Sequence, residues 1–381
     1  MTQNDVKKGI LSGLTAACTV GAYSICVTSA LGLNIWCAFL CAVCCGIFSV
    51  GLRDKIYCPM VYFAVPLTVL TGSGLSNLIP ICCVFGAVIY FILSKKVKKT
   101  FISASAQSGI FLGVSLLATI IFTNLYFGIG ANGATGLNML SSYRSLGFHP
   151  DFRGLLYGTI TLFAMITYPF KYKKLNKHLP AEFMTLLIPL LLNLFLNPQK
   201  ELTMSNELTS LEGADFSQIL LIGNITENLS LNSAALALYC GFAMGILLFI
   251  CTEKEDNSLR FSVYNIANGI LSGVPVKERE IPYYSPLSAV ISIAVCGAVM
   301  FGLNGIIARI PMYSVGALLI VSAWQNIPYK KLSQGFKEYG VFALVQIIIC
   351  VVSFVIFDIT TAMIISIAIS FIGRRLKGDK G

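Results

Sequence analysis

Apolar stretches of close to 20 residues recur along this sequence from end to end, and this pattern constrains the fold more than any single motif. A helix needs about 20 apolar residues to cross the hydrocarbon core of a bilayer. Of the 381 residues, 56% are hydrophobic and only 12% are charged, whereas a soluble domain is typically about one quarter charged. The composition therefore predicts an all-α, multi-pass membrane protein, with no polar stretch long enough to form a soluble domain.

Two of the apolar segments are interrupted at places where a transporter would hold its substrate. We predict spans over residues 9–29, 33–51, 58–71, 78–94, 101–128, 152–170, 180–197, 231–251, 259–274, 286–304, 311–327, 340–357 and 359–373. Short or Gly/Pro-interrupted spans at corresponding places in two halves indicate a transporter site. Tyr57-Cys58-Pro59-Met60 opens such a segment in the first half, and Val274-Pro275-Val276 breaks one in the second.

The basic residues predict which segments share a side, because Lys and Arg are retained on the cytoplasmic side of a membrane. With the N-terminus inside, almost all Lys and Arg before residue 260 fall inside, and the exceptions are Arg144, Arg153 and Lys200. The Lys and Arg after residue 260, except Arg309, also lie inside only if the chain crosses once more over Val276–Ser285. We therefore expect this segment to cross in an extended form inside the protein, because its backbone groups cannot face lipid. Both termini are then cytoplasmic.

Several segments resemble the SulP family of anion transporters. The resemblance is clearest at Arg309–Trp324 and Asp358–Ser366, and it extends to Asn265–Val276 and Ser285–Val290. In the first half, the segments Gly9–Thr28, Gly51–Leu67 and Ile102–Gly128 are similar in pattern to family spans. The resemblance implies about 13–14 spans in a 7+7 inverted repeat, with a core and a gate domain. The sequence has no segment like the family's STAS domain.

The resemblance also implies an anion site between the facing N-termini of two half-helices, where free N–H groups and the helix dipole favour negative charge. The first half-helix would start near Pro59–Phe63, so the implied substrate-binding residues are Pro59, Met60 and Val61. Residues of the first span would face them, namely Ala22, Tyr23 and Cys26.

The chain departs from the family between Pro275 and Pro286, where the expected Ser-Arg pair and most of the second half-helix are missing. Lys277-Glu278-Arg279-Glu280 stands there instead. Ionisable groups at membrane depth are usually functional. We expect Lys277 or Arg279 to bind the anion and regard Glu278 and Glu280 as proton-coupling candidates. The alternative is a solvated loop whose charges pair with one another.

We therefore expect a secondary transporter of a small inorganic or organic anion that works by alternating access, and not an enzyme. Residues 1–197 would form the first repeat, 198–230 an extracytoplasmic loop, 231–373 the second repeat with a shortened tenth span, and 374–381 a short cytoplasmic tail. Two alternatives stay open: a non-transporting scaffold of the same fold and a uracil/xanthine-type permease. The absence of an acid from 231–251 argues against the permease.

The expected partners are a small anion and the lipid bilayer of the cell membrane, with a homodimer left open and no nucleic acid. No cofactor or metal is expected, because no Cys/His spacing resembles a zinc site and His149 and His178 are far apart. Three polar residues are expected to be structural: Asp358 as a helix N-cap, and Asn265 and Asn268 through hydrogen bonds between helices.

Overall fold

The computed structural model of the chain describes residues 3–52, 54–97, 101–130, 133, 135–146, 152–196, 229–252 and 258–376. Four of the described helices are long and apolar enough to cross a membrane, judged by length and composition: Gln3–Ala30, Ser76–Lys96, Ala104–Phe127 and Leu231–Cys251. Five further described apolar helices have between 10 and 17 residues: Ile35–Phe48, Val61–Gly72, Ala181–Leu196, Pro286–Gly302 and Val341–Ile356. The predicted all-α membrane architecture is confirmed. Most of the predicted loop 198–230 and residues 377–381 of the tail lie outside the described residues.

The first half of the chain contains α1 (Gln3–Ala30), α2 (Ile35–Phe48), β1 (Lys55–Pro59), α3 (Val61–Gly72), η1 (Ser76–Leu78), α4 (Ile79–Lys96), α5 (Ala104–Phe127), α6 (Gly136–Leu146), α7 (Phe152–Lys171), α8 (Lys173–Asn176) and α9 (Ala181–Leu196). The second half contains α12 (Leu231–Cys251), α13 (Ser258–Ser272), β2 (Val276–Glu280), α14 (Pro286–Gly297), η4 (Ala298–Gly302), α15 (Asn304–Ile307), α16 (Met312–Gln325), α17 (Tyr329–Tyr339), α18 (Val341–Ile356) and α19 (Ile359–Leu376).

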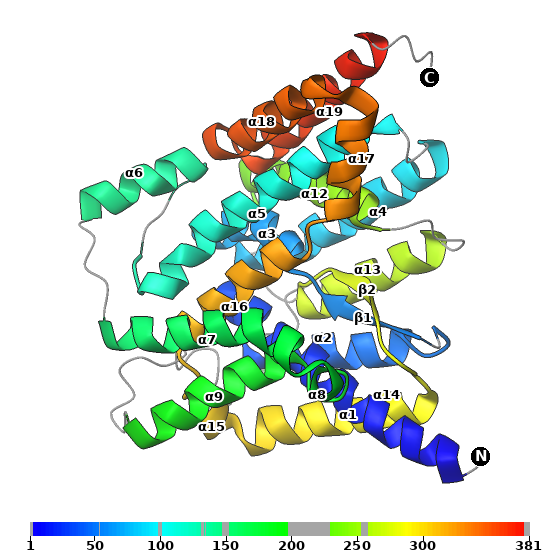
Figure 1. Cartoon of the computed structure of the whole chain (residues 1–381), viewed down its shortest axis with the longest axis vertical. Coiled ribbons are helices and arrows are strands. Elements are labelled where there is room, and N and C mark those ends of the chain that lie inside the picture. Colours follow the sequence, from blue (N-terminus) through cyan, green and yellow to red (C-terminus); the bar gives the residue numbers. More distant parts are fainter. Residues whose placement is uncertain are drawn as a thin grey trace.

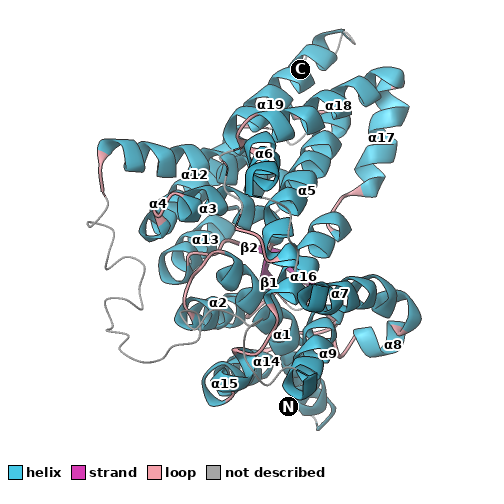
Figure 2. Cartoon of the chain, turned by 90° about the vertical axis from the view of Figure 1, so that its left-hand side faces the viewer, coloured by secondary structure: helices cyan, strands magenta, loops and turns pink. Residues whose placement is uncertain are grey.

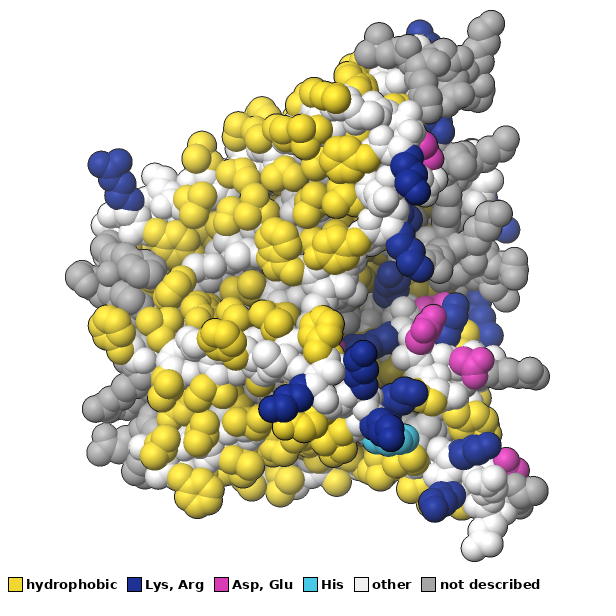
Figure 3. Space-filling model, viewed as in Figure 1, with side chains coloured by type: hydrophobic (Ala, Val, Ile, Leu, Met, Phe, Trp, Pro, Cys, Tyr) yellow, Lys and Arg dark blue, Asp and Glu magenta, His cyan; other side chains and the backbone are white. Residues whose placement is uncertain are grey.

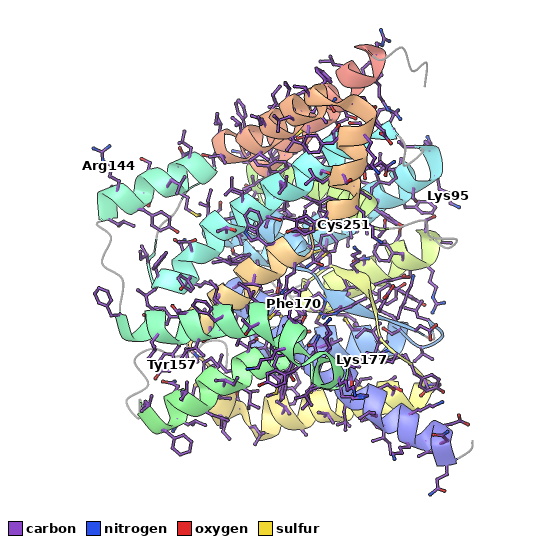
Figure 4. All side chains as sticks on the ribbon, viewed as in Figure 1. Lys95, Arg144, Tyr157, Phe170, Lys177 and Cys251 are labelled. Atoms are coloured by element: carbon purple, nitrogen blue, oxygen red, sulfur yellow. The ribbon has the colours of Figure 1, made fainter. Side chains whose placement is uncertain are left out.

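Most of the helices lie roughly across the view of Figure 1, and many of them cover only part of the width of the molecule. Both termini lie at the right-hand edge, which we call the N-terminal face, and Lys and Arg side chains gather along this edge beside a broad apolar surface (Figure 3). Figure 4 places Lys95 at this face and Arg144 at the other edge, the opposite face. The positions of these residues agree with the sidedness predicted from the charges.

The helices pack in two groups. One group contains α1–α4 with α12–α14, and the other contains α5, α7 and α9 with α16, α18 and α19. Several helices begin at the small polar caps that favour helix starts: Asn34 before α2, Ser103 before α5, Ser230 before α12 and Ser285 before α14. Amphipathic α17, which was not among the predicted spans, lies along the N-terminal face (Figure 1).

The two strands lie in the middle of the molecule, surrounded by helices (Figure 2). They pair antiparallel, with Lys55 opposite Glu280 and Pro59 opposite Val276. Because the strands satisfy each other's backbone groups inside the protein, extended chain is tolerated there. Two side chains of α13 hold the start of β2: Asn265 Oδ1 accepts the Val276 N–H at 2.8 Å, and Asn268 Nδ2 donates to the Val274 carbonyl.

The predicted crossing over Val276–Ser285 is wrong, although the segment is extended and packed within the protein as expected. Helix α13 enters from the N-terminal face, and β2 returns to that face, with Glu280 opposite Lys55. Helix α14 then leaves from the same face alongside α1, where Ser288 Oγ lies 2.8 Å from Ser12 Oγ. The hairpin of α13 and β2 is therefore re-entrant. The re-entrant hairpin and the predicted extra crossing both place the basic residues that follow on the N-terminal face.

The second half-helix that the resemblance implied is absent. Residues 273–285 contain strand β2 and no helix. Gly273, at a φ of +71°, ends α13 in the left-handed region that glycine tolerates, and Pro275 cannot donate to a continuing helix. The shortened sequence between Pro275 and Pro286 thus replaces a helix by a strand.

Candidate functional site

A cavity of about 240 Å³ lies where β1 ends and α3 begins. The two packing groups both contribute to its wall. From the first group come side chains of α1, the β1–α3 junction and β2, and from the second come the start of α9 and the end of α16. The lining residues are Tyr23, Cys58, Pro59, Met60, Val61, Glu182, Lys277, Glu278, Arg279, Gln325 and Asn326.

The N-terminus of α3 faces this cavity without a side-chain cap. Met60, the N-cap residue, is extended and makes no capping hydrogen bond through its side chain. The first N–H groups of a helix have no partner within the helix, and the helix dipole adds partial positive charge at this end. Because Met60 and Val61 line the cavity, the start of α3 offers it the electrostatics of an anion site.

Arg279 of β2 contributes a full positive charge, but it already has a partner. Its Nη2 lies 2.7 Å from Glu182 Oε1, and its guanidinium lies over the Tyr23 ring at 5.5 Å from the centroid. The Tyr23 hydroxyl donates to the same Glu182 oxygen at 3.3 Å and lies 3.1 Å from Ser322 Oγ of α16. The Glu182 side chain is 6% exposed, whereas that of Arg279 is 39% exposed.

The other charges of β2 differ in their surroundings. Lys277 is half-buried and lines the cavity. Glu278 also reaches the cavity wall, and its Oε2 accepts from Lys55 Nζ at 2.6 Å. Glu280 is exposed, opposite Lys55 in the strand register. The segment is therefore not a solvated loop, because the pairing of β1 with β2 fixes the position of each charge.

The structure brings most of the predicted site residues together. Those that line the cavity are Tyr23, Pro59, Met60, Val61, Lys277, Glu278 and Arg279. Ala22 instead lines a separate apolar cavity of about 170 Å³ between α1, α9 and α14. Cys26 is fully buried and does not line the cavity at α3, and Glu280 lies outside it.

Sequence reasoning missed Glu182, Gln325 and Asn326, and it named Cys58 only as part of the interrupted segment that begins at Tyr57. A usable signal existed for Glu182, because it is the only ionisable residue in the predicted span 180–197, and such residues are usually functional. Gln325 and Asn326 directly follow the segment Arg309–Trp324 that carried the resemblance. Among the described residues, no group of His, Cys, Asp and Glu could hold a metal ion.

A second cavity, of about 340 Å³, approaches α3 from the opposite face. Its wall includes Val65 and Thr68 of α3, Ala30 at the end of α1 and Asn124 at the end of α5. Val65 is one helical turn beyond Val61, about 6 Å along the axis. Tyr62, which follows Val61 on α3, is fully buried, and its hydroxyl donates to the Ala323 carbonyl at 2.6 Å.

No family model and no curated protein matches the sequence, but solved structures match its fold. The transmembrane domain of the cyanobacterial bicarbonate transporter BicA matches with a TM-score of 0.68 at 13% identity, over 98% of each chain. SLC26A9 matches with a TM-score of 0.68 at 12% identity, over 100% of this chain and 67% of that one. The murine Slc26a9 anion transporter in its inward-facing state matches with a TM-score of 0.65 at 12% identity, over 99% of this chain and 69% of that one.

The chain has the membrane-domain fold of these transporters. This fold is an inverted repeat with a core and a gate domain, as the sequence resemblance implied. The group of α1–α4 with α12–α14 contains the interrupted spans and corresponds to the core, and the other group corresponds to the gate. The candidate site therefore lies between core and gate, and the ion pair of Arg279 with Glu182 connects the two.

Proposed function

We propose that this protein is a secondary transporter of a small inorganic or organic anion. The observation that carries the proposal is the cavity between core and gate, where the uncapped N-terminus of α3 meets Lys277 and Arg279. Helix N–H groups and basic side chains are the groups that recognise small anions. Met60, Val61, Lys277 and Arg279 would bind the substrate, and Tyr23 and Pro59 would shape the cavity.

The second cavity supports alternating access as the mechanism. Two cavities that approach one helix from opposite faces, about one turn apart, need only a small displacement of core against gate for one to open as the other closes. In broken-helix transporters, such rocking around a central site is the usual mechanism. The solved structures with this fold include a bicarbonate transporter and an anion transporter, which supports a small anion as the substrate.

We further propose that the protein lies in the cell membrane with its N-terminal face, and so both termini, on the cytoplasmic side. The two repeats would span residues 1–197 and 231–373, joined by the loop 198–230 and followed by the tail 374–381. Glu278 and Glu280 remain candidates for proton coupling. A homodimer is proposed as the assembly in the membrane.

Flux measurements on the purified full chain in liposomes test this proposal. We expect uptake of at least one of radiolabelled sulfate, bicarbonate and a dicarboxylate, and we expect Arg279→Ala to reduce that uptake at least tenfold. Lys337→Ala, on exposed α17, is the matched control and should transport like the wild type. Undiminished flux in Arg279→Ala would remove Arg279 from the site.

One observation favours a second candidate, a non-transporting scaffold of the same fold. Arg279 is already neutralised by Glu182, and the strand β2 has no helix N-terminus to complete the site. A scaffold would show no flux for any anion in the panel and no change in thermal stability when those anions are added. Flux of any one of them excludes this candidate.

A further inference from the structure

The carboxylate of Glu182 neutralises Arg279, the basic side chain that an anionic substrate would need. We propose that Glu182 is an internal counter-anion, and that it takes up a proton when an anion binds to Arg279. The substrate would then enter together with a proton. This inference rests on the proposed function and assigns a coupling residue to the same site.

The geometry distinguishes the two members of the pair. Glu182 Oε1 accepts from both Arg279 Nη2 and the Tyr23 hydroxyl, at 2.7 and 3.3 Å. The Glu182 side chain is nearly sealed at 6% exposed, but that of Arg279 is 39% exposed. Both side chains line the cavity, and the larger exposure of Arg279 lets an anion reach the guanidinium from it. Two negative charges on one guanidinium repel each other in this partly dry site, and protonation of the carboxyl removes the repulsion.

Among the groups around the cavity, Glu182 is the one whose protonation changes the net charge next to the α3 N-terminus. Strand β2 supplies Arg279, Lys277 and Glu278, and Glu278 is paired with Lys55 of β1. The remaining neighbours are uncharged: Tyr23 of α1, Cys58 of β1, and Ser322, Gln325 and Asn326 of α16. With Glu182 neutral, Arg279 and Lys277 present two positive charges beside the α3 N-terminus. With Glu182 ionised, one of these charges is cancelled.

The location of the pair adds a mechanical consequence. Glu182 belongs to α9 in the gate, and Arg279 belongs to β2 in the core. A proton on Glu182 therefore frees Arg279 for substrate and weakens a charged link between the two domains. Glu278 and Glu280 are less suited to this role, since neither forms an ion pair with Arg279 in the described part of the chain.

Anion binding to the detergent-purified full chain tests this inference without a membrane. The probes are sulfate and nitrate, because neither changes its charge between about pH 5.5 and 8.5. We expect the wild-type Kd to rise with pH, up to about tenfold per pH unit for one linked proton. Glu182→Gln should bind tightly at every pH in this range. Glu338→Gln, on exposed α17 where Glu338 bonds only Gln334 among the described residues, should follow the wild type.

A second measurement needs no variant and so stands even if Glu182→Gln fails to fold. When sulfate or nitrate is added to wild-type protein in weak buffer, in the pH range where Kd rises about tenfold per pH unit, a pH dye should report close to one proton taken up per anion bound. Anion binding with no proton uptake, or equal pH dependence in wild type and Glu182→Gln, overturns the inference and leaves the proposed function intact. If neither protein binds sulfate, nitrate, bicarbonate or a dicarboxylate, the result instead contradicts the proposed function.

Discussion

At the scale of single residues, the ion pair of Arg279 with Glu182 is the main electrostatic interaction within the site. Removal of one partner from a buried pair leaves an uncompensated charge and costs about 3–5 kcal/mol, whereas removal of both is often nearly neutral. Arg279→Leu would leave the Glu182 carboxylate, which is 6% exposed, without its cation. Because this carboxylate lies at the wall of a cavity, we expect the free energy of unfolding to fall by a smaller amount, about 1–3 kcal/mol.

The double variant Glu182→Leu with Arg279→Leu should be more stable than Arg279→Leu alone, as measured by thermal unfolding in detergent. Lys55→Ala is the control. It breaks the pair with Glu278, but the Lys55 side chain is 49% exposed, so the expected cost is about 0–1 kcal/mol. A double variant less stable than the single one would mean that the pair is not held together mainly by charge.

Asp358 gives a prediction about pH. It caps α19, accepting the Thr360 and Thr361 N–H groups at 3.0 Å and the Tyr239 hydroxyl of α12 at 2.7 Å. Burial alone would raise the pKa of Asp358, but these hydrogen bonds to the ionised form hold it below its usual value. A lowered folded-state pKa contributes stability that is present above the unfolded pKa and is lost as the pH falls through the folded one.

We therefore expect Asp358→Ala to lower the free energy of unfolding by about 0.5–2 kcal/mol at neutral pH. The difference from wild type should shrink below about pH 4, where the unfolded carboxyl becomes protonated. Asp358→Asn, which can still cap the helix, should cost less at neutral pH. A difference that stays constant down to about pH 3 would contradict this explanation.

Whether the role of a residue can be predicted from the sequence depends on how far along the chain its partners lie. Lys277 and Arg279 stand out because they are charged and sit beside a helix-breaking Gly-Val-Pro in an apolar region. Asp358 is predictable as a cap because its partners are two and three residues away. Glu182 acquires its role only by contact with Arg279, 97 positions along the chain, and no local pattern indicates that pairing.

At the scale of elements, helix crossings depend on glycines that let backbones approach. Where α12 meets α4, a Cβ on Gly245 would lie 2.6 Å from Ile89 Cβ and 2.8 Å from the Gly86 carbonyl oxygen. Small residues at helix interfaces permit such contact in membrane proteins. We expect Gly245→Ala to push the two helices apart and lower the free energy of unfolding by about 1–3 kcal/mol.

Gly72, near the end of α3, is the matched control, because a Cβ there would meet nothing within 4 Å. Gly72→Ala should be neutral or gain up to about 1 kcal/mol from helix propensity. Thermal unfolding of both variants in the same detergent measures the difference. If Gly245→Ala proves as stable as Gly72→Ala, the α4–α12 contact is looser than the structure describes.

The elements themselves were predictable to different degrees. Hydropathy finds the spans because a bilayer demands long apolar segments. The strands β1 and β2 were expected as extended chain near Pro59 and Pro275, but their pairing was not, because a register between segments 220 or so positions apart leaves no local trace. Helix α17 was missed because its sequence, YKKLSQGFKEY, is too polar to register as a span.

At the scale of the whole molecule, charge sidedness predicted the correct face for the later basic residues but the wrong path. The positive-inside rule predicts the side of the membrane on which a basic residue lies. It therefore shows only whether the number of crossings before that residue is odd or even. A hairpin that enters and leaves on one face gives the same count as an exit followed by a further crossing. Only the pairing of Glu280 with Lys55 separates the two paths, so the sequence alone could not decide between them.

Cysteine labelling in sealed vesicles distinguishes the two paths. Exposed Glu280→Cys and Lys337→Cys should react with a membrane-impermeant maleimide from one side, and exposed Arg144→Cys from the other. Ser272→Cys, at the buried turn of the hairpin, should react from neither side. The wild-type chain is the control, because twelve of its thirteen thiols are buried and Cys18 is half-buried. Labelling of Ser272→Cys from the side of Arg144 would mean that α13 reaches the opposite face, and the re-entrant hairpin would have to be abandoned.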